Sequence, residues 1–285
     1  GYRWRQWMRM TSLKLAEPSV ELSFWNLGRL LSAGIRREVP WFDPHLHGAG
    51  YWCWKPFIML RELESLQEGD YLLYTDAGRP PGTLFRHSVQ PLVQWLEEKG
   101  QDILPGVNIS YYTGDLSRWC KQSVFDALNL DIRDFEHSPL IQPTPCFLKK
   151  SEESVRILRE WMELCRQFSL VSSPTPEEKS RCRDNFADHT HDQTLWSLVA
   201  AMNHLDCLYS GKGVIHLDGR QPFLRHPGFD DKDPDFFLGE LGAERVERPL
   251  LTFLSGVHQG IAFCEKAVNK LSKIAGLGPL KGFYG

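Results

Sequence analysis

The chain has 285 residues, of which 42% are hydrophobic and 24% charged, a composition that suits a folded protein with a large core and excludes a disordered one. Its 33 basic and 36 acidic residues give a formal net charge of -3 without a basic block, so we expect no nucleic acid partner. The longest apolar runs fall short of the roughly 20 residues that a membrane span needs, so we expect no transmembrane segment and at most peripheral membrane contact.

The first half of the chain predicts alternating helices and strands. Residues 20–24 are a short candidate for a first strand. Pro56 in a first helical turn, followed by apolar residues and then Gly69, predicts a helix over 56–66. Residues 71–74 predict a strand that we expect to be buried on both faces, because its hydrophobicity hardly alternates. Three further elements follow: a helix over 88–99, a strand over 107–112 and a helix over 117–130.

The second half begins with a β-compatible run over 140–149, which two prolines should confine to an edge or irregular strand. Ser151 precedes the clearest helix, over 151–168, whose apolar residues recur every three or four positions. Residues 172–187 read as an exposed loop. The remaining predicted elements are a helix at 194–205 that begins near His191, a strand at 214–217 and an acidic loop at 228–235.

This alternation without internal repeats predicts an α/β fold, with a mixed, mostly parallel central sheet flanked by helices. We assign residues 1–285 to a single domain, with a core at about 20–220 and an irregular C-terminal segment at 221–285. The seven cysteines follow no C-x-x-C or zinc-site spacing, which favours buried thiols in a reducing compartment. We therefore expect a cytoplasmic protein, or a Golgi-lumen protein if the chain is cut from a longer eukaryotic enzyme.

Asp76 is the most informative single residue. It follows an apolar strand directly and precedes Ala77-Gly78, so its carboxylate should lie at the end of a strand, where α/β folds bind ligands. Gly78 would allow a ligand to approach the backbone closely. An aspartate in this position can also be only a turn former or a helix cap.

Two other segments carry chemistry. Lys55 lies between Trp54 and Pro56 at a predicted helix N-terminus, which suits it to hold a phosphate, although the surrounding aromatic residues can equally be core. The second segment contains His191, Asp192 and Gln193, where Asp192 can also be a simple helix cap.

Four segments occur in a familiar order: Gly-Ala-Gly-Tyr-Trp-Cys-Trp-Lys-Pro at 48–56, the strand ending in Asp-Ala-Gly at 69–78, Trp-Cys-Lys at 119–121 leading into 125–128, and His-Thr-His-Asp-Gln-Thr-Leu at 189–195. Over residues 45–205 they resemble a family of polysaccharide-type glycosyltransferases with the GT-A (Rossmann-like) nucleotide-sugar fold. The resemblance implies transfer of a sugar from a nucleotide-diphosphate sugar to an acceptor hydroxyl in polysaccharide or glycoconjugate synthesis. It also implies a divalent cation, Mn²⁺ or Mg²⁺, as cofactor.

By this resemblance, Asp76 is the remaining carboxylate of an Asp-x-Asp motif that holds the metal and the donor ribose, and Gly78 replaces the second carboxylate. Because a hard cation takes about six oxygen ligands, the metal would recruit a downstream histidine such as His226 or His258, or be held mainly by the diphosphate. Asp192 would orient donor hydroxyls or act as general base, and Gln193 would face the anomeric carbon. The other residues that we assign to donor binding are Trp54, Lys55, Ala77, Gly78 and His191.

Two alternatives remain from the sequence. The Asp-x-His-x-His-Gly pattern at 43–48 matches a strand of metal-dependent amidohydrolases, in which alternate histidines bind zinc. A non-catalytic carbohydrate-binding protein would use the same tryptophan and tyrosine surfaces.

Overall fold

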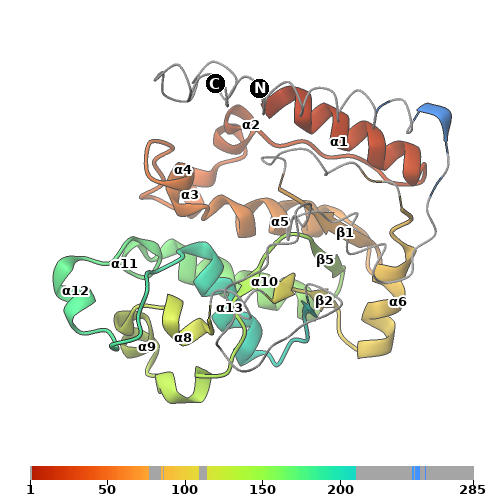
Figure 1. Ribbon diagram of the computed structural model, residues 1–285. Helices are drawn as coiled ribbons and strands as arrows, with labels where there is room; N and C mark the ends of the chain where they lie inside the picture. The colour runs from red at the N-terminus through yellow and green to blue at the C-terminus, as the bar shows by residue number, and fades with distance from the viewer. Residues whose placement is uncertain are drawn as a thin grey trace, which may run out of the picture. The chain divides into compact units, whose positions relative to one another are not determined.

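The computed structural model describes residues 2–76, 85, 87–108, 114–209, 246, 248–250 and 254 (Figure 1). The chain divides into two compact units: the first comprises Gly1–Leu22, Thr75–Trp95 and Leu224–Gly285, and the second comprises Ser23–Tyr74 and Leu96–Phe223. The assignment of 1–285 to one domain stays a prediction. Among the described helices, none is both long enough and apolar enough to cross a membrane.

The first unit contains α1 (Tyr2–Ala16). The buried Ser12 hydroxyl accepts a hydrogen bond from the Phe85 amide at 2.9 Å and donates one to the Arg9 carbonyl at 2.8 Å. Met8 packs with Leu254 in a small buried cluster. These contacts tie α1 to Phe85 and Leu254. The boundary with the second unit falls within α6 (Gln90–Lys99), the helix predicted at 88–99.

The strands of the second unit are short and mostly antiparallel. One sheet has the order β1 (Tyr71–Tyr74), β5 (Cys146–Lys149) and β2 (Ile103–Leu104), and both of its pairings are antiparallel. The other sheet has the order β4 (Ile141–Gln142), β3 (Val107–Asn108) and β6 (Leu208–Tyr209), in which β3 pairs antiparallel with β4 and parallel with β6. The α/β class is confirmed, and the mostly parallel sheet is wrong for the described strands.

Two of the three expectations about individual strands are also wrong. Residues 20–24 form no strand. β1 is half-buried along its length rather than buried on both faces, because β5 is its one partner among the described strands. The run over 140–149 is irregular, as predicted: it divides into β4, at the edge of its sheet, and β5, which lies between two neighbours. β5 tolerates this central place because Pro145 precedes its first residue and removes no amide hydrogen from the strand.

Three helices build the core of the second unit. α10 (Glu152–Arg166) packs against both α5 (Trp54–Ser65) and α13 (Asp192–Met202) (Figure 1). The buried rings of Trp161 and Trp196 meet between α10 and α13, with centroids 4.5 Å apart. The predictions of helices at 56–66, 151–168 and 194–205 are confirmed, and Ser151 caps α10 in a capping box with Ser154.

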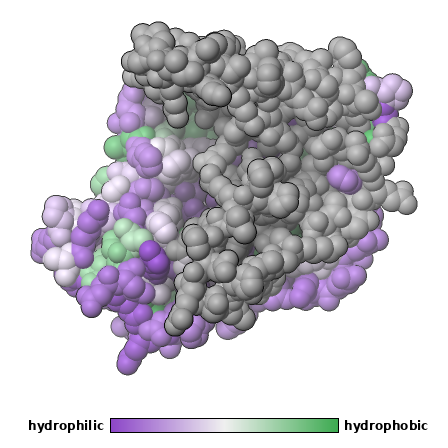
Figure 2. Space-filling model, in the orientation of Figure 1, coloured by the Kyte–Doolittle hydropathy of each residue, from purple (hydrophilic) through white to green (hydrophobic). Residues whose placement is uncertain are grey.

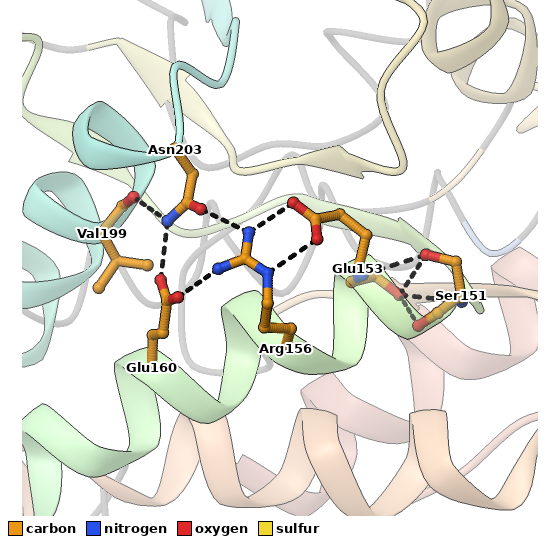
Figure 3. A network of polar contacts seen from close by, with 7 residues as sticks. Ser151, Glu153, Arg156, Glu160, Val199 and Asn203 are labelled. Atoms are coloured by element: carbon orange, nitrogen blue, oxygen red, sulfur yellow. Dashed lines mark hydrogen bonds and ion pairs between the residues drawn. The ribbon is translucent and has the colours of Figure 1, made fainter.

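A polar network also joins α10 to α13 (Figure 3). The Arg156 guanidinium contacts Glu153 and Glu160 and donates a hydrogen bond to the Asn203 side chain at 2.7 Å. The Asn203 amide in turn donates to the Val199 carbonyl at 2.9 Å and to Glu160 at 2.8 Å. This network fixes the C-terminal end of α13 against α10.

The helix expected over 117–130 is divided into α8 (Leu116–Trp119) and α9 (Gln122–Leu128), because Lys121 has extended backbone angles.

Residues 172–187 are mainly exposed, as predicted, but they contain α12 (Pro176–Ser180). Figure 2 shows mainly hydrophilic residues at the left edge, where α12 lies in Figure 1. Residues 109–112, 214–217 and 228–235 lie outside the described part of the chain. The other short helices are α2 (Leu27–Ser32), α3 (Ile35–Glu38), α4 (Gly48–Tyr51), the 3-10 helix η1 (Ile132–Phe135) and α11 (Phe168–Val171).

Candidate functional site

Residues 48–52 form a left-handed turn, which is rare for L-amino acids. Their φ angles are all positive, from Gly48 at 60° and Ala49 at 52° to Trp52 at 56°. The Tyr51 amide donates to the His47 carbonyl at 2.6 Å, and the Trp52 amide donates to the Gly48 carbonyl at 3.3 Å. Each residue other than glycine costs about 1–2 kcal/mol in this conformation. Such strain persists only where the surrounding structure holds the backbone in place, and it is concentrated at functional sites. The turn is therefore a candidate functional element.

Packing explains the two glycines of the left-handed turn. A Cβ atom on Gly48 would lie 2.4 Å from the Trp52 indole ring, and one on Gly50 would lie 2.9 Å from the Phe42 ring. The Trp54 indole N–H donates to the Gly48 carbonyl at 3.2 Å and closes the turn from its C-terminal side. The structure therefore gives Trp54, predicted as a donor-binding residue, a contact that holds the turn.

The left-handed turn packs against the segment that precedes α13. The centroid of the His191 ring lies 4.6 Å from that of Tyr51, at an interplanar angle of 35°, and 6.0 Å from that of Trp52. The centroid of the His47 ring lies 4.9 Å from that of Trp52 and 5.5 Å from that of His191. We call His47, Tyr51, Trp52 and His191 the ring cluster. His47 is exposed, whereas Tyr51 and Trp52 are half-buried and His191 is buried.

His191 is itself strained and oriented by its neighbours. Its φ of 56° and ψ of -123° are unusual for a residue with a side chain. Its Nδ1 lies 2.9 Å from the Val171 carbonyl oxygen, which can only accept, so Nδ1 carries the proton and Nε2 carries the lone pair. Burial lowers the pKa of His191, and burial followed by the nearby Lys121 ammonium holds the pKa of His189 well below its usual value. Both imidazoles are therefore neutral near pH 7.

Beneath the ring cluster lies a buried ion pair. The Lys55 Nζ is 3.0 Å from Asp192 Oδ2, and the two side chains are 5% and 2% exposed. The same Nζ lies 5.8 Å from the centroid of the Trp52 ring. Burial raises the pKa of the Cys53 thiol, and the Asp192 carboxylate raises it further. Lys55 and Asp192 thus form a charged pair in a surrounding where neither charge is well solvated.

Main-chain contacts fix the first turn of α13. The Trp161 indole N–H donates to the Asp192 carbonyl at 3.1 Å. The Thr194 hydroxyl donates to the Trp119 carbonyl at 2.7 Å and accepts a hydrogen bond from the Thr190 amide at 3.1 Å. Asp192 is the first residue of α13 and His191 is its N-cap, so Asp192 is not the cap that the alternative interpretation required. Gln193 follows Asp192 and is partly exposed.

The structure brings together one part of the predicted site. Lys55, Asp192 and His191 lie in the second unit and meet there, whereas Asp76 belongs to the first unit. The Asp76 carbonyl accepts a hydrogen bond from Arg9, and its residue is half-buried. The remaining predicted residues lie outside the described part of the chain: Ala77, Gly78, His226 and His258.

The predicted metal site gains no support in the described residues, because they contain no group of three or more histidine, cysteine, aspartate or glutamate side chains that could hold an ion. The Asp-x-His-x-His-Gly segment at 43–48 is a series of turns rather than a strand, and the Asp43 carboxylate accepts from the His45 amide at 2.9 Å. The strand that would present alternate histidines to zinc is therefore missing from this segment.

Sequence reasoning missed the left-handed turn and the residues that it positions. The signal was the Gly-Ala-Gly run directly before two large aromatic residues, because alternate glycines suit a backbone with positive φ. His47 entered the sequence analysis only as a zinc ligand, yet its ring contacts Trp52 and His191. The buried Lys121, which donates to the Ser172 carbonyl at 3.1 Å and pairs with Glu178, was also missed.

A groove of about 440 Å³ lies elsewhere in the second unit, along α10 and the end of α13. Its lining includes Arg156, Glu160 and Met202 and contains none of the predicted site residues. The ring cluster and the ion pair below it remain the candidate site. No protein-family model, curated protein or solved structure matches the chain.

Proposed function

We propose that this protein is a glycosyltransferase that moves a sugar from a nucleotide-diphosphate sugar to an acceptor hydroxyl. The observation that carries the proposal is the buried contact between Lys55 and Asp192. It joins two segments that resemble the same enzyme family and that lie far apart in the sequence. The pair lies beneath the strained left-handed turn and the ring cluster.

The ring cluster suits a sugar or nucleoside ring. Carbohydrate sites combine aromatic faces with a small number of well-placed polar groups. Here Tyr51 and Trp52 supply aromatic area, and the exposed His47 supplies a polar ring beside it. The positive φ angles of the turn and of His191 fix this surface before a ligand arrives, which lowers the entropic cost of binding.

The chemistry required of such a site is mainly electrostatic. Breaking the glycosidic bond to a diphosphate leaves an oxocarbenium-like sugar and a charged leaving group, and preorganised dipoles and charges stabilise both. In the proposal, Gln193 acts beside the reacting sugar, the buried Asp192 holds the start of α13 in place through its contact with Lys55, and the neutral His191 offers its Nε2 as an acceptor for a sugar hydroxyl.

A carbohydrate-binding protein without catalysis is the second candidate, and the ring cluster itself is the observation that favours it. The two candidates differ in what Gln193 does. In a binding protein, Gln193→Ala weakens sugar affinity and nothing else. In a transferase, the same change lowers turnover by about tenfold or more while the nucleotide-sugar affinity changes little.

The test is a screen of nucleotide sugars against the full chain, with and without Mn²⁺, read as a thermal shift. A ligand at a hundredfold its dissociation constant stabilises a folded protein by about 2.7 kcal/mol. We expect one nucleotide sugar to raise the melting temperature, and Trp52→Ala to abolish the rise. A matched control is Trp7→Ala, since Trp7 is 50% exposed and lies in the first unit. Absence of a shift with every nucleotide sugar contradicts the proposal.

A further inference from the structure

Lys55 lies close to both the ring cluster and Asp192. Its ammonium lies 3.0 Å from the Asp192 carboxylate and 5.8 Å from the centroid of the Trp52 ring. In sequence it follows the left-handed turn directly, as the second residue of α5, whereas Asp192 opens α13. We infer that Lys55 is a positioning residue, which acts through Asp192 and is not a ligand of the donor phosphate. This inference rests on the proposed function.

Burial argues against a phosphate ligand. The Lys55 side chain is 5% exposed, so its ammonium cannot meet a diphosphate without leaving its present place. Leaving that place would abandon the Asp192 carboxylate, which is 2% exposed. A buried charge without its partner is strongly unfavourable. Leaving Asp192 unpaired would therefore cost more free energy than one contact between Lys55 and a phosphate would gain. The lysine that suited a phosphate in the sequence is therefore already engaged.

The neighbourhood of Asp192 shows what the pair positions. The Asp192 carbonyl is held by the Trp161 indole N–H, and its carboxylate by Lys55. The residue before it, His191, has a strained backbone and stacks on Tyr51 from the left-handed turn. The ion pair thus fastens the start of α13 to the segment that carries the turn. Loss of either charge should release both strained segments together.

The chain contains a matched control for this pair. Lys99 and Asp206 are also a lysine and an aspartate, with 2.8 Å between Nζ and Oδ2, but their side chains are 44% and 58% exposed. Exposed pairs of this kind contribute little to stability, because water and salt screen them. A difference in coupling energy between the two pairs therefore reflects burial and not the type of residue.

The test is a double-mutant cycle on the full chain, with Lys55→Met, Asp192→Asn and the double variant, followed by chemical denaturation. We expect each single change to lower the folding equilibrium constant by about a hundredfold or more, and the double variant to lose much less than the product of the two. The cycle of Lys99→Met and Asp206→Asn should show coupling of less than about fivefold. If Lys55→Met does not fold, recovery of folding in the double variant supports the pair. Additive losses at Lys55 and Asp192 overturn the inference, and so does a double variant that remains unfolded where Lys55→Met does not fold.

Two further readouts separate positioning from phosphate binding. Near-ultraviolet circular dichroism should lose the same aromatic signal in Lys55→Met and Asp192→Asn, because both release the ring cluster. With the donor found by the screen, kcat should fall by a similar factor in both single variants and the double variant, while KM stays within about threefold. A KM that rises in Lys55→Met alone, with an unchanged aromatic signal, overturns the inference. Absence of turnover in the unmodified chain contradicts the proposed function instead, and the denaturation cycle still decides the role of Lys55.

Discussion

Replacing Gly48 by alanine places a methyl group inside the left-handed turn. Gly48 has a φ of +60°, and the new Cβ would lie 2.4 Å from carbon atoms of the Trp52 ring. The backbone strain costs about 1–2 kcal/mol, and displacing a packed ring costs about 1–3 kcal/mol more. We expect the free energy of unfolding to fall by about 2–5 kcal/mol in urea denaturation, with a changed near-ultraviolet signal from the displaced indole.

Gly100→Ala is the matched control for this change. Gly100 has a φ of +62°, lies in the same unit, and has no atom within 4 Å of the position that its Cβ would take. Gly100→Ala therefore has the backbone strain of about 1–2 kcal/mol without any overlap between the new Cβ and a neighbouring ring. The difference between the two variants measures the packing of Trp52 on Gly48. Equal losses in the two variants would refute the reasoning.

Three further predictions concern the supports of the site. His189 is buried and its pKa is lowered, whereas a histidine in the unfolded chain binds a proton below a pH of about 6.5. The free energy of unfolding should therefore fall as the pH is lowered below about 6.5, by up to ~1.4 kcal/mol per pH unit. An equally steep fall in His189→Gln would contradict this. Trp161→Phe removes the N–H that meets the Asp192 carbonyl and should cost about 1–3 kcal/mol in denaturation, and a loss below that range would mean that the bond contributes little. Ser151→Ala removes the capping box of α10 and should cost about 1 kcal/mol, measured in the same way; an unchanged midpoint would show the cap to be dispensable.

Local elements could be predicted from the sequence where one short pattern decides them. Ser151 followed by apolar residues at helical spacing predicts α10, because capping and amphipathicity both act within a few turns. The direction of strand pairing could not be predicted in this way. β5 lies between β1 and β2, and nothing in the residues of β1 says that its partner comes from 146–149 and runs antiparallel.

Some residues of the candidate site could be predicted from the sequence, but their geometry could not. Lys55 and Asp192 could each be singled out by its neighbours in the sequence, but their contact is a tertiary fact that follows from α5 and α13 both packing on α10. For the same reason, Lys55 read as a phosphate ligand, since burial of its ammonium cannot be seen in a linear pattern. The left-handed turn left a weak signal in Gly48 and Gly50, because glycines also occur in many ordinary turns.

The most direct test of the central claim is the detection by mass spectrometry of sugar transferred to an acceptor by the full chain. We predict that one nucleotide sugar gives a glycosylated product together with its nucleoside diphosphate, and that product formation falls by about a hundredfold or more in Gln193→Ala/Asp192→Asn. Asp206→Asn, at the exposed ion pair, should form product at the unmodified rate. Binding of a nucleotide sugar without any transfer, or transfer that persists in the variant without Gln193 and Asp192, would contradict the account.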